Sequence, residues 1–373
     1  MDITRRSIGG STSLVLDGLR LSAALAVLCL HAHDMWFPSS MHRPDQAGNA
    51  SHAAVVVFFV LSGFVIAYTA SMRNAGFGPY MRARLGRLCS MVVPALLLTA
   101  MVEVALRLQG DPGLMALYVR GPFGPRYLMT GAFLNEIWLF SAAPPANIAL
   151  WSLSFEFWYY LIFGLWFFNG RGWKSALLAA GACVVAGPKI VLMMPIWLMG
   201  CAAYRLPRPV LSPARRWTAV VVLLASVLAT IAIVPPRPFP IGQAPFFFAN
   251  QFMTDWAVGL SVALALWLLP TWSAHRDGRV SRDVSPLLVR RVRRLADLTF
   301  PIYLMHYPLL VLWRVLFGTR FEDPVQYAQA VVGTLVVSSI LGLLLEPQRR
   351  HWDRFFDRLS AGMSTQWRGV FAR

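Results

Sequence analysis

Ionisable side chains inside apolar stretches are the residues of this 373-residue chain best placed to do chemistry. Each costs on the order of 3 kcal/mol at the centre of a membrane helix, so a chain that keeps one has a use for it. Arg20 and His31 share the first apolar stretch, and a turn of about 100° per residue returns them to nearly the same helix face, about 16 Å apart along the axis. A neutral histidine accepts a proton from an attacking hydroxyl group, whereas an arginine binds phosphate or carboxylate. The spacing predicts one polar path, with a base at one depth and an anion-binding group at the other. The alternative is that His31 is a structural histidine that forms a hydrogen bond with a neighbouring helix.

The fourth apolar stretch carries a carboxylate, Glu156, about two turns from its start and at a depth comparable to His31. A carboxylate beside a histidine base orients the imidazole and stabilises the imidazolium that forms when a hydroxyl group is deprotonated. We therefore expect Glu156 to support His31. A structural ion pair with any arginine of the bundle explains Glu156 equally well.

Arg84 and Arg87 lie three positions apart near the start of the third apolar stretch, so they are neighbours on one helix face. Their guanidinium groups form a fork that suits the phosphates of a nucleotide-bearing donor. The usual excess of basic residues at cytoplasmic helix ends predicts the same pair without a ligand.

Four further residues are candidates for lining or supporting the same path. Tyr303 and His306 share a helix face in the ninth apolar stretch, although core packing explains them as well. Asp17 lies in the first stretch, and Glu346 lies at the end of the last. The four cysteines have no C-x-x-C spacing, so we expect neither a disulfide framework nor a metal site.

The composition excludes a single water-soluble domain, because 57% of the residues are hydrophobic, 14% are charged and the mean hydropathy is +0.55. About 20 apolar residues cross a hydrocarbon core as a helix. The chain offers about ten such stretches, at residues 14–33, 53–71, 88–108, 148–168, 175–185, 190–204, 217–234, 246–269, 298–317 and 328–345. We expect an all-α, polytopic transmembrane helical bundle, with close helix packing at the small pair Ser62-Gly63.

The formal net charge of +17 reflects topology better than nucleic-acid binding, because the basic residues lie in loops between the apolar stretches. With ten spans, nearly all basic loops fall on one side, which places both termini in the cytoplasm. The first stretch contains Asp17 and Arg20, so we interpret it as a retained helix and not as a removed signal. We expect one integral membrane unit over residues 1–348 and a short basic cytoplasmic tail over 349–373, which faces anionic headgroups or the phosphates of a donor.

Taken together, these segments resemble the acyltransferase-3 family of bacterial integral membrane O-acyltransferases over nearly the whole chain. The most specific match is Arg20 followed by ten residues and His31, which is similar to the family's arginine-x10-histidine signature. Other segments similar to family blocks are residues 58–64, 80–87, 151–156, 303–308 and 346–347. One departure is at residues 55–57, which are valines where many members carry an acid.

The resemblance implies an O-acyltransferase, with acetyl-CoA or another acyl-CoA as donor substrate and no permanently bound cofactor. It implies a carbohydrate or small hydroxylated acceptor, a multi-pass position in the cell inner membrane, and no nucleic-acid partner. His31 and Glu156 would be catalytic, and Arg20, Arg84 and Arg87 would bind the donor. No fused hydrolase-like domain follows residue 346, so a second transfer step would need a partner protein.

A proton-coupled transporter or flippase of a glycan or lipid intermediate is the alternative, since it would use the same buried histidine and glutamate as a proton relay. Recognisable inverted halves and paired broken helices, which are typical of transporters, are missing from the sequence. A membrane scaffold without activity would have no use for the buried charges.

Overall fold

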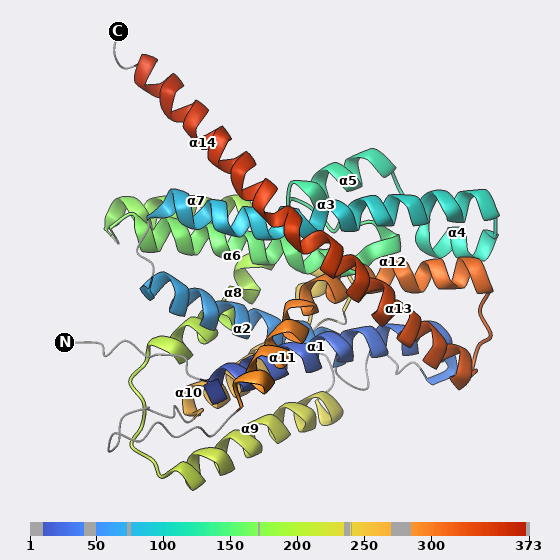
Figure 1. Cartoon of the computed structure of the whole chain (residues 1–373), viewed down its shortest axis with the longest axis horizontal. Coiled ribbons are helices and arrows are strands. Elements are labelled where there is room, and N and C mark those ends of the chain that lie inside the picture. Colours follow the sequence, from blue (N-terminus) through green and yellow to red (C-terminus); the bar gives the residue numbers. More distant parts are fainter. Residues whose placement is uncertain are drawn as a thin grey trace.

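The computed structural model describes residues 10–40, 50–72, 76–170, 172–234, 239, 241–269 and 285–370. Over these residues the chain is an all-α bundle without a strand, in which the long helices lie side by side (Figure 1). The α-helices are α1 (Gly10–Trp36), α2 (Ala50–Met72), α3 (Phe77–Gln109), α4 (Pro112–Tyr118), α5 (Phe123–Gly131), α6 (Trp151–Phe168), α7 (Trp173–Ala186), α8 (Pro188–Arg205), α9 (Pro213–Ile233), α10 (Phe252–Leu268), α11 (Pro286–Asp297), α12 (Thr299–Phe317), α13 (Pro324–Leu345) and α14 (Arg349–Val370).

Ten of these helices match the ten apolar stretches predicted from the sequence. Seven segments, built on α1, α2, α3, α6, α9, α12 and α13, are long and apolar enough to cross a membrane. The helices α7 and α10 are shorter and apolar, and α8 has 18 residues with a charged residue near each end. The predicted polytopic bundle of about ten spans is therefore confirmed. The largest difference is at α3, which begins at Phe77, before the predicted residue 88. The helix α10 begins at Phe252, after the predicted residue 246, because residues 247–249 form a separate 3-10 turn.

The most buried apolar stretches are those of α6 and α2, at 72% and 67%, compared with 11% for α9 at the edge (Figure 1). The closest helix crossing joins α2 to α8. A Cβ atom at Gly63 would lie 2.0 Å from the carbonyl oxygen of Trp197, and one at Gly200 would lie 2.0 Å from that of Val60. Glycine at both positions lets the two backbones approach this closely, as expected for Ser62-Gly63.

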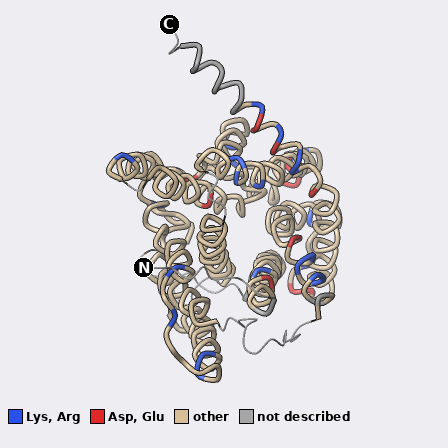
Figure 2. Tube along the Cα trace, turned by 60° about the vertical axis from the view of Figure 1, so that its left-hand side comes forward, with Lys and Arg blue, Asp and Glu red and all other residues tan. Residues whose placement is uncertain are grey.

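Charged residues are few, and most of the trace is uncharged (Figure 2). We call the end of the bundle that carries Arg20, Arg84 and Arg87 the arginine end, and the end toward which α1 carries His31 the opposite end. Much of the loop charge used to predict the orientation lies outside the described residues, at Arg5, Arg6, Arg73, Arg171 and residues 276–282. The cytoplasmic position of both termini therefore stays a prediction.

The helix α14 begins at Arg349, where the sequence predicts the basic tail, and it packs on the first turns of α3. Arg82 on α3 forms an ion pair with Asp357 on α14, with Nε and Oδ1 3.1 Å apart. Asp353 lies against Gly86, where a Cβ atom would be 2.1 Å from the carboxylate oxygen. The start of the tail is thus fixed to the helix that carries Arg84 and Arg87.

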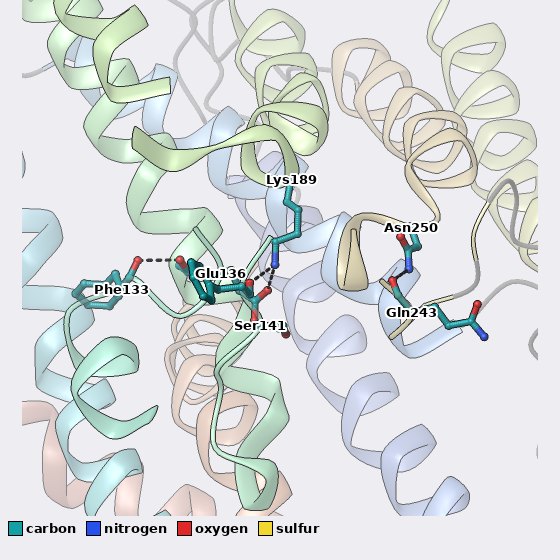
Figure 3. Close-up of polar contacts among 8 residues, drawn as sticks. Phe133, Glu136, Ser141, Lys189, Gln243 and Asn250 are labelled. Carbon is teal, nitrogen blue, oxygen red and sulfur yellow. Dashed lines mark hydrogen bonds and ion pairs between the residues drawn. The ribbon is translucent and has the colours of Figure 1, made fainter. Parts of the chain in front are cut away.

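The connection from α5 to α6 is not helical over residues 133–144, yet much of it is buried in the bundle. Its anchor is Glu136, which is 0% exposed and lies 2.6 Å from Nζ of Lys189, also 0% exposed, at the start of α8 (Figure 3). The ammonium also donates to the carbonyl oxygen of Phe140, and Ser141 Oγ donates to the Glu136 carboxylate at 2.9 Å. Burial raises the pKa of Glu136 to about 7 despite the ammonium beside it. This cluster fixes the segment that leads into α6.

Candidate active site

A cavity lies among α1, α2, α3, α6 and α12. It encloses about 690 Å³ of empty space, including its open mouth. The polar residues on its wall are Arg20, Ser62, Arg84, Arg87, Ser152, Glu156, Tyr160, Thr299 and Tyr303, and the remainder are apolar. Five of the nine residues predicted for the site therefore line one cavity.

The three arginines make the cavity suited to an anion. No carboxylate of the described residues lies within 4.0 Å of Arg20, Arg84 or Arg87, so none of them is consumed by a close ion pair. Arg84 lies 5.6 Å from the ring centre of Tyr80 and 5.9 Å from that of Tyr160, and Arg87 lies 5.6 Å from that of Phe300. These aromatic faces hold the guanidinium groups without neutralising them.

Glu156 lies in the same cavity as the arginines. Its carboxylate accepts a hydrogen bond from Ser62 Oγ at 3.1 Å and a short one from the hydroxyl of Tyr160. Trp197 Nε1 donates to Ser62 Oγ at 3.2 Å, which links this network to the crossing of α2 and α8. Glu156 also lies close enough to Arg20 to interact with it electrostatically.

The expected pairing of Glu156 with His31 is wrong. The side chain that contacts His31 is His306 of α12, with Nδ1 of His31 2.8 Å from Nε2 of His306. Tyr307 packs edge-on against the His31 ring, with ring centroids 5.4 Å apart. Glu156 lies instead among the arginines of the cavity, where it contacts Ser62 of α2 and Tyr160 of its own helix.

Tyr303 connects the cavity to the histidine pair. Its ring lies on the cavity wall, 5.7 Å from the ring centroid of Phe58 and 5.9 Å from that of His306. Its hydroxyl is fixed by Ser152 Oγ at 2.8 Å and donates to the carbonyl oxygen of Ala149 at 3.1 Å. His31 and His306 do not line the cavity themselves, so the pair of histidines is linked to the arginines by contacts through Tyr303 on α12.

Asp17 and Glu346 do not line the cavity. Asp17 accepts a hydrogen bond from Ser13 Oγ at 3.3 Å, one turn earlier in α1. Both Asp17 and Glu346 interact electrostatically with Asp297, at the end of α11. Their place is beside the arginine end, and a supporting role for them stays a prediction.

Asn147 was not predicted as a site residue, although Pro308 in a helix leaves a carbonyl oxygen that needs another hydrogen-bond donor. Proline has no N–H, so the carbonyl oxygen four residues earlier, on Leu304, has no helical partner. Asn147 fills this vacancy by donating from Nδ2 to Leu304 O at 3.0 Å and to Thr99 Oγ1 at 3.1 Å. Its backbone lies at φ −153° and ψ 66°, outside the helical region, so a kink in the 3-10 helix Pro145–Leu150 before α6 braces the turn of α12 that carries His306.

A second histidine–carboxylate pair was also missed. His52 Nε2 lies 3.0 Å from Asp255 Oδ2, and both side chains are buried. The His52 ring stacks on Trp151, with centroids 5.2 Å apart and planes within 9°. Asp255 lies inside a predicted span, and its charge was a signal that a partner had to exist. The pair is one turn from Val55 of the cavity wall, so it fixes α2, α6 and α10 relative to one another.

Comparisons with known proteins show similarity over most of the chain. A family model described as an acyltransferase domain, Acyl_transf_3, matches residues 14–343. The protein described as "Acyltransferase MdmB" from Streptomyces mycarofaciens is 25% identical over 355 residues, which cover 87% of this chain and 86% of that protein. No solved structure matches the chain.

Proposed function

Because the chain belongs to the acyltransferase-3 family, and is therefore a membrane acyltransferase, we propose that it transfers an acyl group from acyl-CoA to a hydroxyl group of a carbohydrate or similar small acceptor. Acetyl-CoA is the donor that we propose, and the cell inner membrane is the proposed location. The observation that carries the proposal is the cavity with three arginines that have no close ion-pair partner among the described residues, and that is linked by contacts of Tyr303 to a pair of histidines.

The donor half of the proposal rests on charge. A nucleotide thioester carries several phosphate charges at one end and a neutral acyl thioester at the other. Arg84 and Arg87 lie one turn apart on α3 and Arg20 faces them from α1, so three guanidinium groups can bind phosphate oxygens while the arm follows the apolar wall past Phe58. This arrangement requires the arginine end to face the cytoplasm, where acyl-CoA is found, and it agrees with the predicted position of both termini.

The acceptor half of the proposal rests on His31. In direct transfer, the hydroxyl oxygen of the acceptor attacks the thioester carbonyl while His31 takes the hydroxyl proton. The C–S bond then breaks, and the thiolate that leaves takes this proton back, which yields an ester and a thiol without net proton release. Glu156, which does not contact His31, would act on the donor side, where its carboxylate fixes Ser62 and Tyr160.

The experiment is transfer by the purified chain in proteoliposomes, with labelled acetyl-CoA and with longer acyl-CoA donors, and with mono- and oligosaccharides and small alcohols as acceptors. We expect His31→Ala to reduce transfer by at least about 100-fold, because the base is lost. Arg87→Ala is expected to raise KM for the donor about 10- to 100-fold, because charge-assisted hydrogen bonds to phosphate are lost.

Arg82→Ala is the matched control, because Arg82 lies on the same helix but pairs with Asp357 outside the cavity. The proposal is wrong if no acyl-CoA labels any acceptor, or if the Arg82 and Arg87 variants have equal KM for the donor. Movement of an unmodified glycan across the vesicle membrane would instead support the transporter.

A further inference from the structure

We infer that His306 is a positioning residue, which holds His31 in the tautomer that carries its proton on Nδ1 and so leaves Nε2 as the base. This inference rests on the proposed function, because it explains how His31 is prepared to accept a proton from the acceptor hydroxyl group. His306 is buried and does not line the cavity, so neither its burial nor the cavity explains this role.

The assignment starts at a backbone carbonyl group, which can only accept a hydrogen bond. His306 Nδ1 lies 2.6 Å from the carbonyl oxygen of Tyr303, one turn earlier in α12. Nδ1 of His306 must therefore carry a proton and donate it. In a neutral imidazole the other nitrogen then has a lone pair, so His306 Nε2 is an acceptor.

His306 is neutral because its surroundings offer no counter-charge. Its side chain is 0% exposed, and no carboxylate of the described residues lies within 4.0 Å of it. The titratable groups that face the two rings are Tyr303 and Tyr307 of α12. An imidazolium ion buried among them would lack the compensation that a buried charge requires.

Since His306 Nε2 accepts, the nitrogen that faces it must donate. That nitrogen is Nδ1 of His31, at 2.8 Å. The ring planes are within 3° of each other and the centroids are 5.1 Å apart, much farther than the two nitrogens, so the rings lie edge to edge and the hydrogen bond runs in their common plane. This is the favourable geometry for an N–H group that points at a lone pair.

The consequence is that Nε2 of His31 holds a lone pair and no proton. In the described part of the chain no side chain or backbone group forms a hydrogen bond with this nitrogen. His31 is partly exposed whereas His306 is fully buried, so His31 is the member of the pair that an acceptor can reach. Once His31 has taken the proton, His306 Nε2 still accepts from Nδ1 and stabilises the imidazolium ion.

The backbone carbonyl group of Tyr303, which fixes the tautomer of His306, is itself held in place. Tyr303 O precedes Leu304 O, the oxygen that Pro308 leaves without a helical partner and that Asn147 occupies at 3.0 Å. The ring of Tyr303 is fixed through its hydroxyl to Ser152 and Ala149. The turn of α12 that starts the chain of hydrogen bonds is thus anchored at two points.

Two amide substitutions of His306 test the inference, because each keeps one nitrogen position of the ring. In His306→Gln the amide lies where Nε2 was and can still accept from His31. In His306→Asn the amide lies where Nδ1 was, so it keeps the bond to Tyr303 O but leaves His31 without an acceptor. We expect transfer within about 10-fold of the wild type for Gln and a loss of about 100-fold or more for Asn, the scale of general-base catalysis.

Equal losses in the two variants, or a more active Asn variant, would overturn the inference. If either variant fails to fold, as judged by thermal unfolding in detergent, the wild-type protein provides a second measurement. In ¹⁵N-histidine-labelled protein, with His31 assigned by its absence in His31→Ala, Nδ1 of His31 is expected to be protonated and Nε2 not. The opposite tautomer would overturn the inference.

The failure of this inference and that of the proposed function are distinguishable. Full transfer by His31→Ala removes His31 from catalysis and with it the reason for a positioning residue. Loss of transfer in His31→Ala, together with equal rates for wild type, Gln and Asn at position 306, would leave the acyltransferase mechanism in place and remove His306 alone.

Discussion

The crossing of α2 and α8 makes Gly63→Ala the sharpest test of the fold. The added methyl group would lie 2.0 Å from the carbonyl oxygen of Trp197 and 3.2 Å from the backbone nitrogen of Cys201. Ordinary contacts between carbon and a carbonyl oxygen lie at about 3.3 Å or more, so the helices must separate by about 1.3 Å. Backbone atoms cannot rotate away as a flexible side chain can.

A separation of this size weakens the packing between α2 and α8 along their whole contact. A gap of about 0.5–1 Å already forfeits a quarter to a half of the dispersion attraction between facing atoms, and overpacking a core typically costs about 1–3 kcal/mol. We expect about 3 kcal/mol for Gly63→Ala, because the neighbour is rigid. Transfer activity should fall as well, because the bond from Trp197 Nε1 to Ser62 Oγ, at 3.2 Å, depends on the same crossing.

The matched control is Gly181→Ala in α7, where a Cβ atom would meet nothing within 4 Å. Alanine is the better helix former by about 1 kcal/mol, so this variant is expected to be as stable as the wild type or slightly more so. The assay is thermal unfolding of both variants in the same detergent, where about 3 kcal/mol corresponds to a fall of roughly 4 °C in Tm for a chain of this length. Equal Tm values for the two variants would show that α2 and α8 are not in backbone contact at Gly63.

Two further predictions concern buried polar groups. Lys189→Met leaves the Glu136 carboxylate without its counter-charge and should lower the stability by about 3–5 kcal/mol, as measured by thermal unfolding. Most of this stability should be regained in the double variant Lys189→Met/Glu136→Leu. A single variant as stable as the double one would contradict the buried ion pair. Asn147→Ala leaves the Leu304 carbonyl oxygen unpaired and should lower the stability by about 1–3 kcal/mol. The control Asn169→Ala, at an exposed helix end, should change the stability little in the same assay. An Asn147→Ala variant of unchanged stability would show that the Leu304 oxygen does not need this donor.

The sequence predicts the helices well, because length and hydrophobicity are local properties. Arg20 and His31 are carried on one uninterrupted helix as the spacing requires, and Arg84 and Arg87 share a cavity with Arg20. The start of α10 was misplaced because residues 246–251 are apolar enough for a span but form a separate turn.

Which side chains meet across helices could not be predicted, because depth follows from position in the sequence while rotation about the helix axis depends on packing. The sequence predicts comparable depths for Glu156 and His31, yet Glu156 lies with the arginines and contacts Ser62, and α12 brings His306 to His31. The pairs His52–Asp255 and Glu136–Lys189 join residues far apart in the chain. Each pair contains a buried charged residue, which must have a partner, but the sequence does not show which residue that partner is.

The position of Lys189 constrains how the polypeptide enters the bilayer during synthesis. The helix α7 has 14 residues, about 21 Å at the usual rise, which is shorter than a hydrocarbon core of about 30 Å, and α8 starts with a lysine that is fully enclosed in the finished protein. Neither helix is a good independent substrate for a translocon. Glu136 leaves the ribosome 53 residues ahead of Lys189, so its carboxylate stays uncompensated until α8 arrives. Insertion of the α7–α8 hairpin is thereby coupled to docking against the preceding segments.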